Sequence, residues 1–430
     1  MMSFRPINLL LAFIIIYLPY VQHFPIVFEV KGLNMMNMLF FAVVIYVLLR
    51  KAKTQTPAPL KGYFLFFIFA LCLSFLIGQF YDDSSFGDDL TTLKTNVFYM
   101  LFYFAFYYAI RDVATIRTLF AAILVVTVFV SLQCIRQGID YGFGDFTDTH
   151  RASGPFAVDY RGANLAAAYF IIFLPLFFSV FLVYRSKLYL RLIAIAGLLV
   201  GLTGVFVTYS RQAYLILAAL LFFQAARKNV LLGIIVALAV ISYEAWAPEA
   251  LVDRLQNTEQ VDDNSGEQRL DVSTESRFIL WAGAMELIAE RPWGIGLNHF
   301  RRTIGRIVPE YANYDPHNGF VRVATEAGLL GVTAFVLLLV KLFRLARRVG
   351  KLDASEDTQL FARAFSISVI GVAASNLFGS RIFDGDVMGN FWILAALVAR
   401  YYTLMLEKTT SGAEIVSEDF PVNAKVKAVV

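Results

Sequence analysis

The segment ANLAAAYFIIFLPLFFSVFLVY, residues 163–184, decides the fold class because its 22 residues include no charged side chain. A helix of this length is long enough to cross the hydrocarbon core of a bilayer, which is ~30 Å thick. The whole chain of 430 residues is 58% hydrophobic and 15% aromatic, a composition that excludes an ordinary soluble domain. We therefore predict an all-α integral membrane protein.

Apolar runs of similar length recur on both sides of this segment and predict about twelve membrane-spanning helices. The first run follows Arg5 directly and lacks a signal-peptide cleavage pattern, so we interpret it as a retained span. Cys72 and Cys134 both fall inside spans, which favours neither a disulfide framework nor a zinc site. The predicted spans cover residues 5–22, 33–50, 61–80, 95–111, 116–135, 163–184, 190–208, 211–226, 229–246, 327–345, 361–379 and 387–406.

The distribution of basic residues predicts the orientation of the spans. An even number of spans places both termini on one side, and cytoplasmic termini would put 22 of the 37 Lys and Arg residues inside. Short outer segments are acidic, as at Asp82-Asp83 and Asp88-Asp89. The predicted organisation is spans 1–9 in residues 1–246, a large outer loop in 247–326, spans 10–12 in 327–406 and a flexible cytoplasmic tail in 407–430.

The basic residues predicted on the outer face are almost all arginines. They number 15, of which thirteen are Arg, and only Lys31 and Lys94 are Lys. Membrane topology does not require this choice, because Lys and Arg serve it equally. Arg presents a rigid fork that binds phosphate oxygens in pairs. Ordinary surface charge explains any single Arg, but the set as a whole favours anion binding.

One segment of the large loop has the pattern of an amphipathic helix. Apolar residues recur at intervals of three to four within residues 273–290. Ser273 or Thr274 can cap the start of this helix, and Arg291-Pro292 ends it. The predicted apolar face consists of Phe278, Trp281, Met285 and Ile288. This face either lies in the membrane interface or packs on other helices, and the pattern favours neither.

Glycines punctuate the rest of the loop and the following span. Gly294 and Gly296 predict a turn, after which Asn298 is expected to cap a short helix. That helix would carry His299, Arg301 and Arg302. Gly328 and Gly331 lie where the tenth span begins, and we expect them to allow the close approach of a neighbouring helix.

The motif Asp315-Pro316-His317-Asn318 predicts the start of the long helix that leads into the tenth span. Asp315 is a good N-cap and Pro316 a good first helical residue, which places His317 and Asn318 in the first turn. The partial positive charge at the amino end of a helix attracts anions and disfavours imidazolium. We therefore expect His317 to be neutral and able to accept a proton.

These motifs together resemble the O-antigen ligase family, and more broadly the O-antigen ligase/polymerase superfamily of bacterial envelope glycosyltransferases. The resemblance rests on their order and spacing over most of residues 150–400. The motifs are His317-Asn318 with Gly328-Leu329-Leu330-Gly331, Ser276-Arg277-Phe278 with Trp281, Arg291-Pro292-Trp293-Gly294-Ile295-Gly296, Tyr209-Ser210-Arg211-Gln212-Ala213, and Arg151-Ala152-Ser153-Gly154 with Asn164. The chain departs from the pattern at Asp159-Tyr160, where many relatives carry Asn-Pro, and this puts a role for Asn164 in doubt.

The resemblance implies a GT-C-like glycosyltransferase in the bacterial inner membrane, with its active site on the periplasmic face. The implied donor is O-antigen polysaccharide on undecaprenyl diphosphate, and the implied acceptor is a sugar of lipid A–core. Such enzymes are expected to use no metal, no cofactor and no nucleotide sugar, and to invert the anomeric centre. Nucleic acid is not an expected partner, membrane lipids are, and the oligomeric state stays open.

Within this interpretation the loop and its neighbours supply the candidate site residues. His317 is the expected general base, and Asn318 is expected to orient a sugar hydroxyl. Arg161 and Arg211 are the first candidates to bind the diphosphate and stabilise the charge that develops on it. Further candidates are Arg277, Arg301 and Arg302, followed by Arg136 and Arg381. Asp384-Gly385-Asp386 and Asp82-Asp83 could bind a cation, but we interpret both as turn residues.

Three other functions remain open. An O-antigen polymerase would use the same donor with a second lipid-linked glycan as acceptor, and a protein O-glycan ligase would use a protein. A lipid or polysaccharide transporter belongs to another class, and twelve spans suit it. Transporters place ionisable residues near the midplane of their spans, whereas the spans here are almost free of charge.

Overall fold

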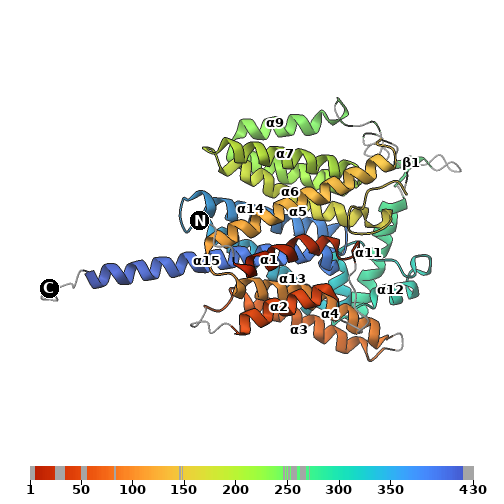
Figure 1. The fold of residues 1–430 in the computed structure, drawn as a ribbon. Coiled ribbons are helices and arrows are strands. Elements are labelled where there is room, and N and C mark those ends of the chain that lie inside the picture. Colours follow the sequence, from red (N-terminus) through yellow and green to blue (C-terminus); the bar gives the residue numbers. More distant parts are fainter. Residues whose placement is uncertain are drawn as a thin grey trace, which may run out of the picture.

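The chain folds, in a computed structural model, into a bundle of long helices that run roughly side by side (Figure 1). The structure describes residues 5–24, 34–49, 56–81, 84–144, 147, 149–245, 247, 249, 252, 259–261, 268–270 and 272–419. The helices are α1 Pro6–Tyr17, α2 Met35–Leu49, α3 Lys61–Gly78, α4 Phe86–Ala109, α5 Val113–Asp140, α6 Ala163–Val183, α7 Leu188–Phe206, α8 Arg211–Lys228, α9 Val230–Ile241, α11 Val272–Glu290, α12 Phe300–Thr303, α13 Gly319–Val349, α14 Glu356–Leu377 and α15 Gly385–Asp419. Short 3-10 turns cover Leu18–Tyr20, Tyr160–Gly162, Tyr243–Ala245, Ile304–Arg306, Pro309–Tyr311 and Arg381–Phe383.

Each of the twelve predicted spans coincides with one of these helices, so the helical fold is confirmed. In the part of the chain that the structure describes, seven helices are long and apolar enough to cross a membrane: α3, α5, α6, α7, α13, α14 and α15. Helices α1, α2 and α9 are apolar but shorter. Helix α4 carries Lys94 and Asn96 in its first half, and α8 carries Arg211, Arg227 and Lys228 at its ends, which lowers the hydropathy of both. The sequence did not predict a small antiparallel hairpin of β1 (Glu259–Val261) and β2 (Gln268–Leu270) within the large loop.

Helix α6 lies at the centre of the bundle, and nearly all of its residues are buried. It packs on α5, α7, α8 and α14. Pro175 within α6 has no N–H to donate, and its carbonyl accepts from Ser179 Oγ at 3.0 Å and from Gln224 Nε2 of α8 at 3.3 Å. Gly371 lets α14 approach closely, because a Cβ there would lie 2.8 Å from the Ile171 carbonyl oxygen.

The two ends of the bundle carry different parts of the chain. Helices α11 and α12 and strand β1 lie together at one end, here called the loop end (Figure 1). The C-terminal part of α15 extends from the opposite end, here called the tail end (Figure 1). Helix α15 continues to Asp419, so the first half of the segment 407–430 that we expected to be a flexible tail is helical. Residues 420–430 lie outside the described residues.

Candidate functional site

A kink in α13 joins two of the sequence motifs into one structural unit. Gly328 interrupts the helix with φ +65° and ψ −169°. The loop before α12 docks against this kink through three backbone hydrogen bonds: Leu329 N to Pro292 O at 2.9 Å, Ile295 N to Thr325 O at 3.0 Å and Gly296 N to Glu326 O at 3.0 Å. The Arg-Pro-Trp-Gly-Ile-Gly motif therefore holds the start of α13 in place from outside the helix.

Glycine is required at this junction because two backbone segments touch. A Cβ on Gly328 would lie 2.4 Å from the carbonyl carbon of Trp293, and a Cβ on Gly294 would lie 2.4 Å from the oxygen of Glu326. Both glycines also have positive φ. The expected role of Gly331 differs in the structure, because its Cβ would meet Ala327 of the same helix rather than a neighbouring helix.

Replacing Gly328 with alanine is expected to destabilise the protein by at least ~1–3 kcal/mol, because its φ and ψ lie in a region that only glycine occupies readily. The clash with Trp293 adds to that cost. Thermal unfolding of the purified variant measures the effect. Gly62→Ala in α3 is the matched control, since its Cβ would meet nothing within 4 Å. Equal melting temperatures for Gly328→Ala and wild type would contradict the account of the kink.

The structure corrects the predicted start of the long helix. Helix α13 begins at Gly319, and its N-cap is Asn318, whose Oδ1 accepts from Phe320 N at 3.0 Å and Val321 N at 3.2 Å. His317 therefore precedes the helix instead of lying in its first turn, with a left-handed φ of +50°. Asp315 forms a local turn of its own, because its Oδ1 accepts from His317 N at 2.9 Å.

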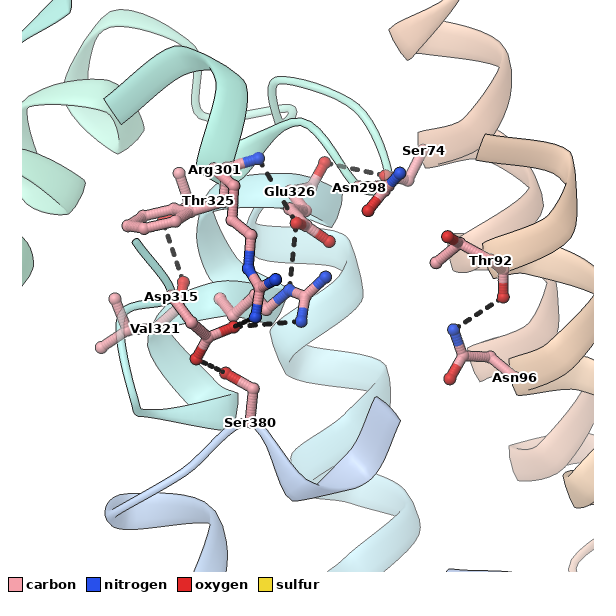
Figure 2. Close-up of polar contacts among 12 residues, drawn as sticks. Ser74, Thr92, Asn96, Asn298, Arg301, Asp315, Val321, Thr325, Glu326 and Ser380 are labelled. Atoms are coloured by element: carbon pink, nitrogen blue, oxygen red, sulfur yellow. Dashed lines mark hydrogen bonds and ion pairs between the residues drawn. The ribbon is translucent and has the colours of Figure 1, made fainter. Parts of the chain in front are cut away.

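Asp315 connects the segment that carries His317 to three other segments. Its carboxylate accepts from Ser380 Oγ at 2.7 Å and from Arg322 Nη1 at 3.1 Å, and it pairs with Arg301 at 3.7 Å. Figure 2 shows Asp315 between Ser380 and Arg301. Burial alone would raise the pKa of Asp315, but Arg322 and the Ser380 hydrogen bond lower it below its usual range, so the carboxylate is ionised.

Arg322 and Glu326 complete a buried charge network at the start of α13 that the sequence analysis did not identify. Arg322 Nε donates to Glu326 Oε1 at 3.1 Å, and the Arg322 guanidinium lies 4.5 Å from the centre of the Phe383 ring. The Glu326 side chain is 1% exposed, and its backbone oxygen accepts from Ser74 Oγ of α3 at 2.8 Å (Figure 2). The network thus fixes α13 against α3 and against the loop that follows α14.

Helix α11 supports the His317 segment from the other side. Trp281 Nε1 donates to the Pro316 oxygen at 2.7 Å. The prediction of a helix over 273–290 is confirmed, and the residues that it buries differ from the predicted apolar face. The residues of α11 that pack in the small core of the loop are Leu280, Ala284 and Leu287, whereas Phe278 is 55% exposed and Met285 62%. Both exposed side chains belong to the predicted apolar face, whose position in the membrane interface stays a prediction.

The surroundings of His317 favour its neutral form. Its side chain is partly buried, and burial lowers the pKa below the ordinary value. Asp315 opposes this shift, while the positive charges of Arg277, Arg381 and Arg301 add to it. The expected neutrality of His317 is therefore supported, but the causes are burial and three arginines, since His317 is not part of a helix.

Three of the predicted arginines lie around His317. Arg277 comes from α11, Arg301 from α12 and Arg381 from the loop after α14, and all three act on His317 electrostatically. Arg301 is 57% exposed. Arg381 is mostly buried and pairs with Asp384 at 2.8 Å. The fold thus brings together, around one histidine, three arginines that lie up to about 100 residues apart in the sequence.

Arg302 lies in a different cluster, which attaches α12 to α4. It pairs with Asp89 at 3.0 Å, and Asp89 also contacts His299 Nε2 at 3.1 Å, with both of those side chains fully buried. Asn298 does not cap α12 as predicted. It has φ +69°, and its Nδ2 donates to Asp89 Oδ1 at 3.1 Å. The cluster holds the loop against the bundle, and the sequence did not predict that these loop residues contact Asp89.

The remaining motifs meet beside the start of α6. Asn164 Oδ1 accepts from Arg151 Nη2 at 3.0 Å and from Ser210 Oγ at 3.3 Å, which joins three motif segments at one residue. Arg151 Nε also donates to the Thr208 oxygen at 3.0 Å. Arg211 is the first residue of α8 next to this junction.

The last two candidate arginines have exposed side chains and pair locally. Arg161 is 78% exposed and pairs with Asp159 at 2.9 Å, while Arg136 is 83% exposed and pairs with Asp140 at 3.9 Å. Their proposed contact with a diphosphate remains a prediction.

The acidic pair Asp384 and Asp386 is engaged by the protein's own side chains. Asp384 pairs with Arg381, and Asp386 accepts from Tyr99 at 3.2 Å and from Gln22. Among the described residues, no group of three or more His, Cys, Asp or Glu side chains is placed to hold a metal ion. Asp82-Asp83 lies outside the described residues.

Comparison with known families finds a similarity in this region. Residues 156–336 match the family model described as O-antigen ligase, and this range includes α6, the α7–α8 turn, α11, His317 and the kink at Gly328. No curated protein matches the chain. The apolar helices, together with this match, indicate a multi-pass membrane protein similar to the ligase and polymerase type of bacteria. The resemblance drawn from the short motifs is thereby confirmed as a match of residues 156–336 to the O-antigen ligase family model.

Proposed function

We propose that the protein is an O-antigen ligase of the bacterial inner membrane. It transfers O-antigen polysaccharide from undecaprenyl diphosphate to a sugar of lipid A–core, with inversion at the anomeric carbon. One observation carries this proposal. Within the matched region 156–336, burial and the charges of Arg277, Arg301 and Arg381 lower the pKa of His317, which favours its neutral form. A neutral base beside several cations suits a reaction in which a hydroxyl loses a proton while a diphosphate departs.

The reaction requires two events at the anomeric carbon of the donor. The bond from that carbon to the diphosphate oxygen breaks, and a bond to the acceptor oxygen forms on the opposite face. A ring nitrogen of His317 takes the proton from the acceptor hydroxyl. The departing diphosphate keeps the electron pair, and Arg277, Arg301 and Arg381 stabilise its charge. Arg161 precedes α6 and Arg211 begins α8, and both remain candidates to bind the diphosphate.

Asn318 has a different primary role from the one expected. Its Oδ1 caps α13, and its side chain is 6% exposed. We propose that it positions His317 by fixing the start of the helix, and that a sugar hydroxyl reaches the amide only through the remaining Nδ2 group.

The rate of transfer should depend on pH through the protonation of His317. Because its pKa is lowered, the neutral form persists below the ordinary histidine value of 6.5, so kcat/KM should stay level down to pH values below 6.5 and then fall. The neutral form of His317 also contributes to the free energy of unfolding. This contribution is present above pH 6.5 and is lost as the pH falls through the lowered pKa.

Arg277→Gln removes a cation that lowers the pKa of His317, so the acid limb of the pH profile of this variant should move to higher pH. An unmoved acid limb in Arg277→Gln would show that another group titrates.

The same substitution should also reduce the rate of transfer. A hydrogen bond to a charged group contributes roughly 1.5–3 kcal/mol, so Arg277→Gln is expected to lower kcat about ten- to a hundredfold. Arg306→Gln is the matched control, because Arg306 belongs to the same loop, is 50% exposed and pairs with Glu290. The initial rate of glycan transfer in proteoliposomes measures both variants. Equal rates for the two would remove Arg277 from the diphosphate site.

An acceptor competition separates the ligase from the polymerase. Purified protein in proteoliposomes would receive undecaprenyl diphosphate-linked glycan together with lipid A–core. We expect glycan on lipid A–core, in the presence of EDTA as well as in its absence. Longer glycan that remains on undecaprenyl diphosphate would identify a polymerase instead, and a requirement for a divalent cation would overturn the metal-free mechanism.

A further inference from the structure

A cavity of about 250 Å³ lies at the tail end of the bundle, away from His317. It is formed by the last turns of α8 and α13 and by the first half of α14. His317 and this cavity are separated along α13 by nearly the whole helix, roughly 40 Å at 1.5 Å per residue. The cavity therefore has no part in the chemistry proposed for the loop end.

Four basic side chains line the cavity, and its lining includes no Asp or Glu. They are Arg227, Arg347, Lys351 and Arg363. Arg363 is repelled by Arg227 and also by Arg185, and Lys228 is repelled by Arg185 and Arg363. Like charges that line one cavity raise the free energy of the empty site, and a bound anion relieves that repulsion.

The acidic residues at this end of α14 are occupied elsewhere. Glu356 pairs with Lys187 at 2.8 Å, and Asp357 pairs with Arg117 and accepts from Tyr184 at 3.2 Å. Asp353 accepts from the backbone N of Ser355 at 2.9 Å. Among the ion pairs between described residues, none joins a carboxylate to the four basic side chains of the cavity.

The cavity is amphipathic along its depth. Three of its basic residues lie near the ends of α8 and α13, and Arg363 lies in the first half of α14. Further along α14 the lining becomes apolar, with Ile367 and Ile370, and Phe343 of α13 adds an aromatic wall. A free inorganic anion uses only the basic part, whereas a molecule with a phosphate group and an alkyl chain uses both.

We infer that this cavity binds the phosphate headgroup of an anionic phospholipid from the surrounding bilayer. The forked guanidinium groups of Arg227 and Arg363 contact the phosphate oxygens, and the acyl chain follows the apolar wall of Phe343 and Ile367. Basic pockets between helices at a membrane surface are suited to such headgroups. This lipid would be a structural ligand and not a substrate of the transfer reaction.

The test uses the purified full-length chain and measures lipid binding without any assay of transfer. Native mass spectrometry counts the phosphatidylglycerol molecules that the protein retains in competition with phosphatidylcholine, and thermal unfolding measures the stabilisation. We expect selective retention of phosphatidylglycerol and a higher melting temperature. The double variant Arg227→Gln with Arg363→Gln should weaken retention by about fivefold for each arginine removed. Arg348→Gln is the matched control, since Arg348 is exposed, follows the cavity residue Arg347 in α13 and does not line the cavity.

Two outcomes would overturn the inference. One is equal retention of phosphatidylglycerol by wild type and the double variant. The other is an equal rise in melting temperature with inorganic phosphate alone, which would identify a site for free phosphate. If the double variant does not fold, Arg227→Gln alone serves, because Arg227 is exposed. Arg363→Lys, which keeps the charge, should retain more lipid than a glutamine at that position.

Discussion

Replacing His317 with alanine is expected to lower kcat for glycan transfer about 10²–10⁴-fold, the usual contribution of a general base. The acceptor hydroxyl would then have no neutral imidazole to receive its proton. The protein should still fold, because the His317 side chain is only partly buried and the backbone N that bonds Asp315 is kept. Initial rates in proteoliposomes, at saturating donor and acceptor, measure the loss.

A second histidine provides the control for this experiment. His23 is exposed, and His23→Ala should leave kcat within about twofold of wild type because it removes only a surface side chain. Both variants should have melting temperatures near that of wild type. A His317→Ala variant that transfers glycan at the wild-type rate would exclude His317 as the base.

Replacing Arg322 with methionine is expected to cost roughly 3–5 kcal/mol of stability, the usual effect of removing one partner from a buried ion pair. The Arg322 side chain is 11% exposed, and it bonds both Asp315 and Glu326 at 3.1 Å. Without it, the buried Glu326 carboxylate would lose this guanidinium, and Asp315 would keep only its longer ion pair with Arg301. Because Asp315 also bonds the backbone of His317, transfer should fall together with stability.

Thermal and denaturant unfolding of the purified variant measure this cost. Arg306→Met is the matched control, because its ion pair with Glu290 is half exposed and such pairs contribute at most about 1 kcal/mol. The combination of Arg322→Met with Asp315→Asn and Glu326→Gln should recover part of the lost stability, since it removes the uncompensated charges. Equal effects of Arg322→Met and Arg306→Met would show that the buried network does not hold α13.

The sequence predicted the helices of the bundle because hydropathy alone determines which segments enter a membrane. The run over 163–184 is an example, since it became the buried centre of the fold as α6. The helix over 273–290 was also predicted, but not its buried face. Its apolar residues surround the helix, so the choice of Leu280 and Leu287 over Phe278 and Met285 depends on neighbours that periodicity does not specify.

The start of α13 shows a different limit. Asp315 and Asn318 are both good N-caps, and local preference does not distinguish them. The structure uses Asn318, because the Asp315 carboxylate bonds Ser380 and Arg322 instead. The neighbours of a residue along the chain do not reveal whether its side chain will cap the helix or bind a distant partner.

Contacts across long stretches of sequence account for the other differences in the site. Asp89 and His299 are 210 residues apart, and their burial together is a property of the fold. The sequence marked an arginine-rich segment, but it could not select which arginines surround His317. The fold places Arg277, Arg301 and Arg381 there and pairs Arg302 with Asp89.

The most direct test of the account is whether the purified chain alone transfers a lipid-linked glycan. Protein in proteoliposomes would be incubated with undecaprenyl diphosphate-linked glycan and lipid A–core in EDTA, and mass spectrometry would identify the products. The account predicts glycan-bearing lipid A–core and free undecaprenyl diphosphate in equal amounts, from wild type and not from His317→Ala. Intact donor after incubation with folded wild-type protein, while a known ligase consumes it under the same conditions, would contradict the account.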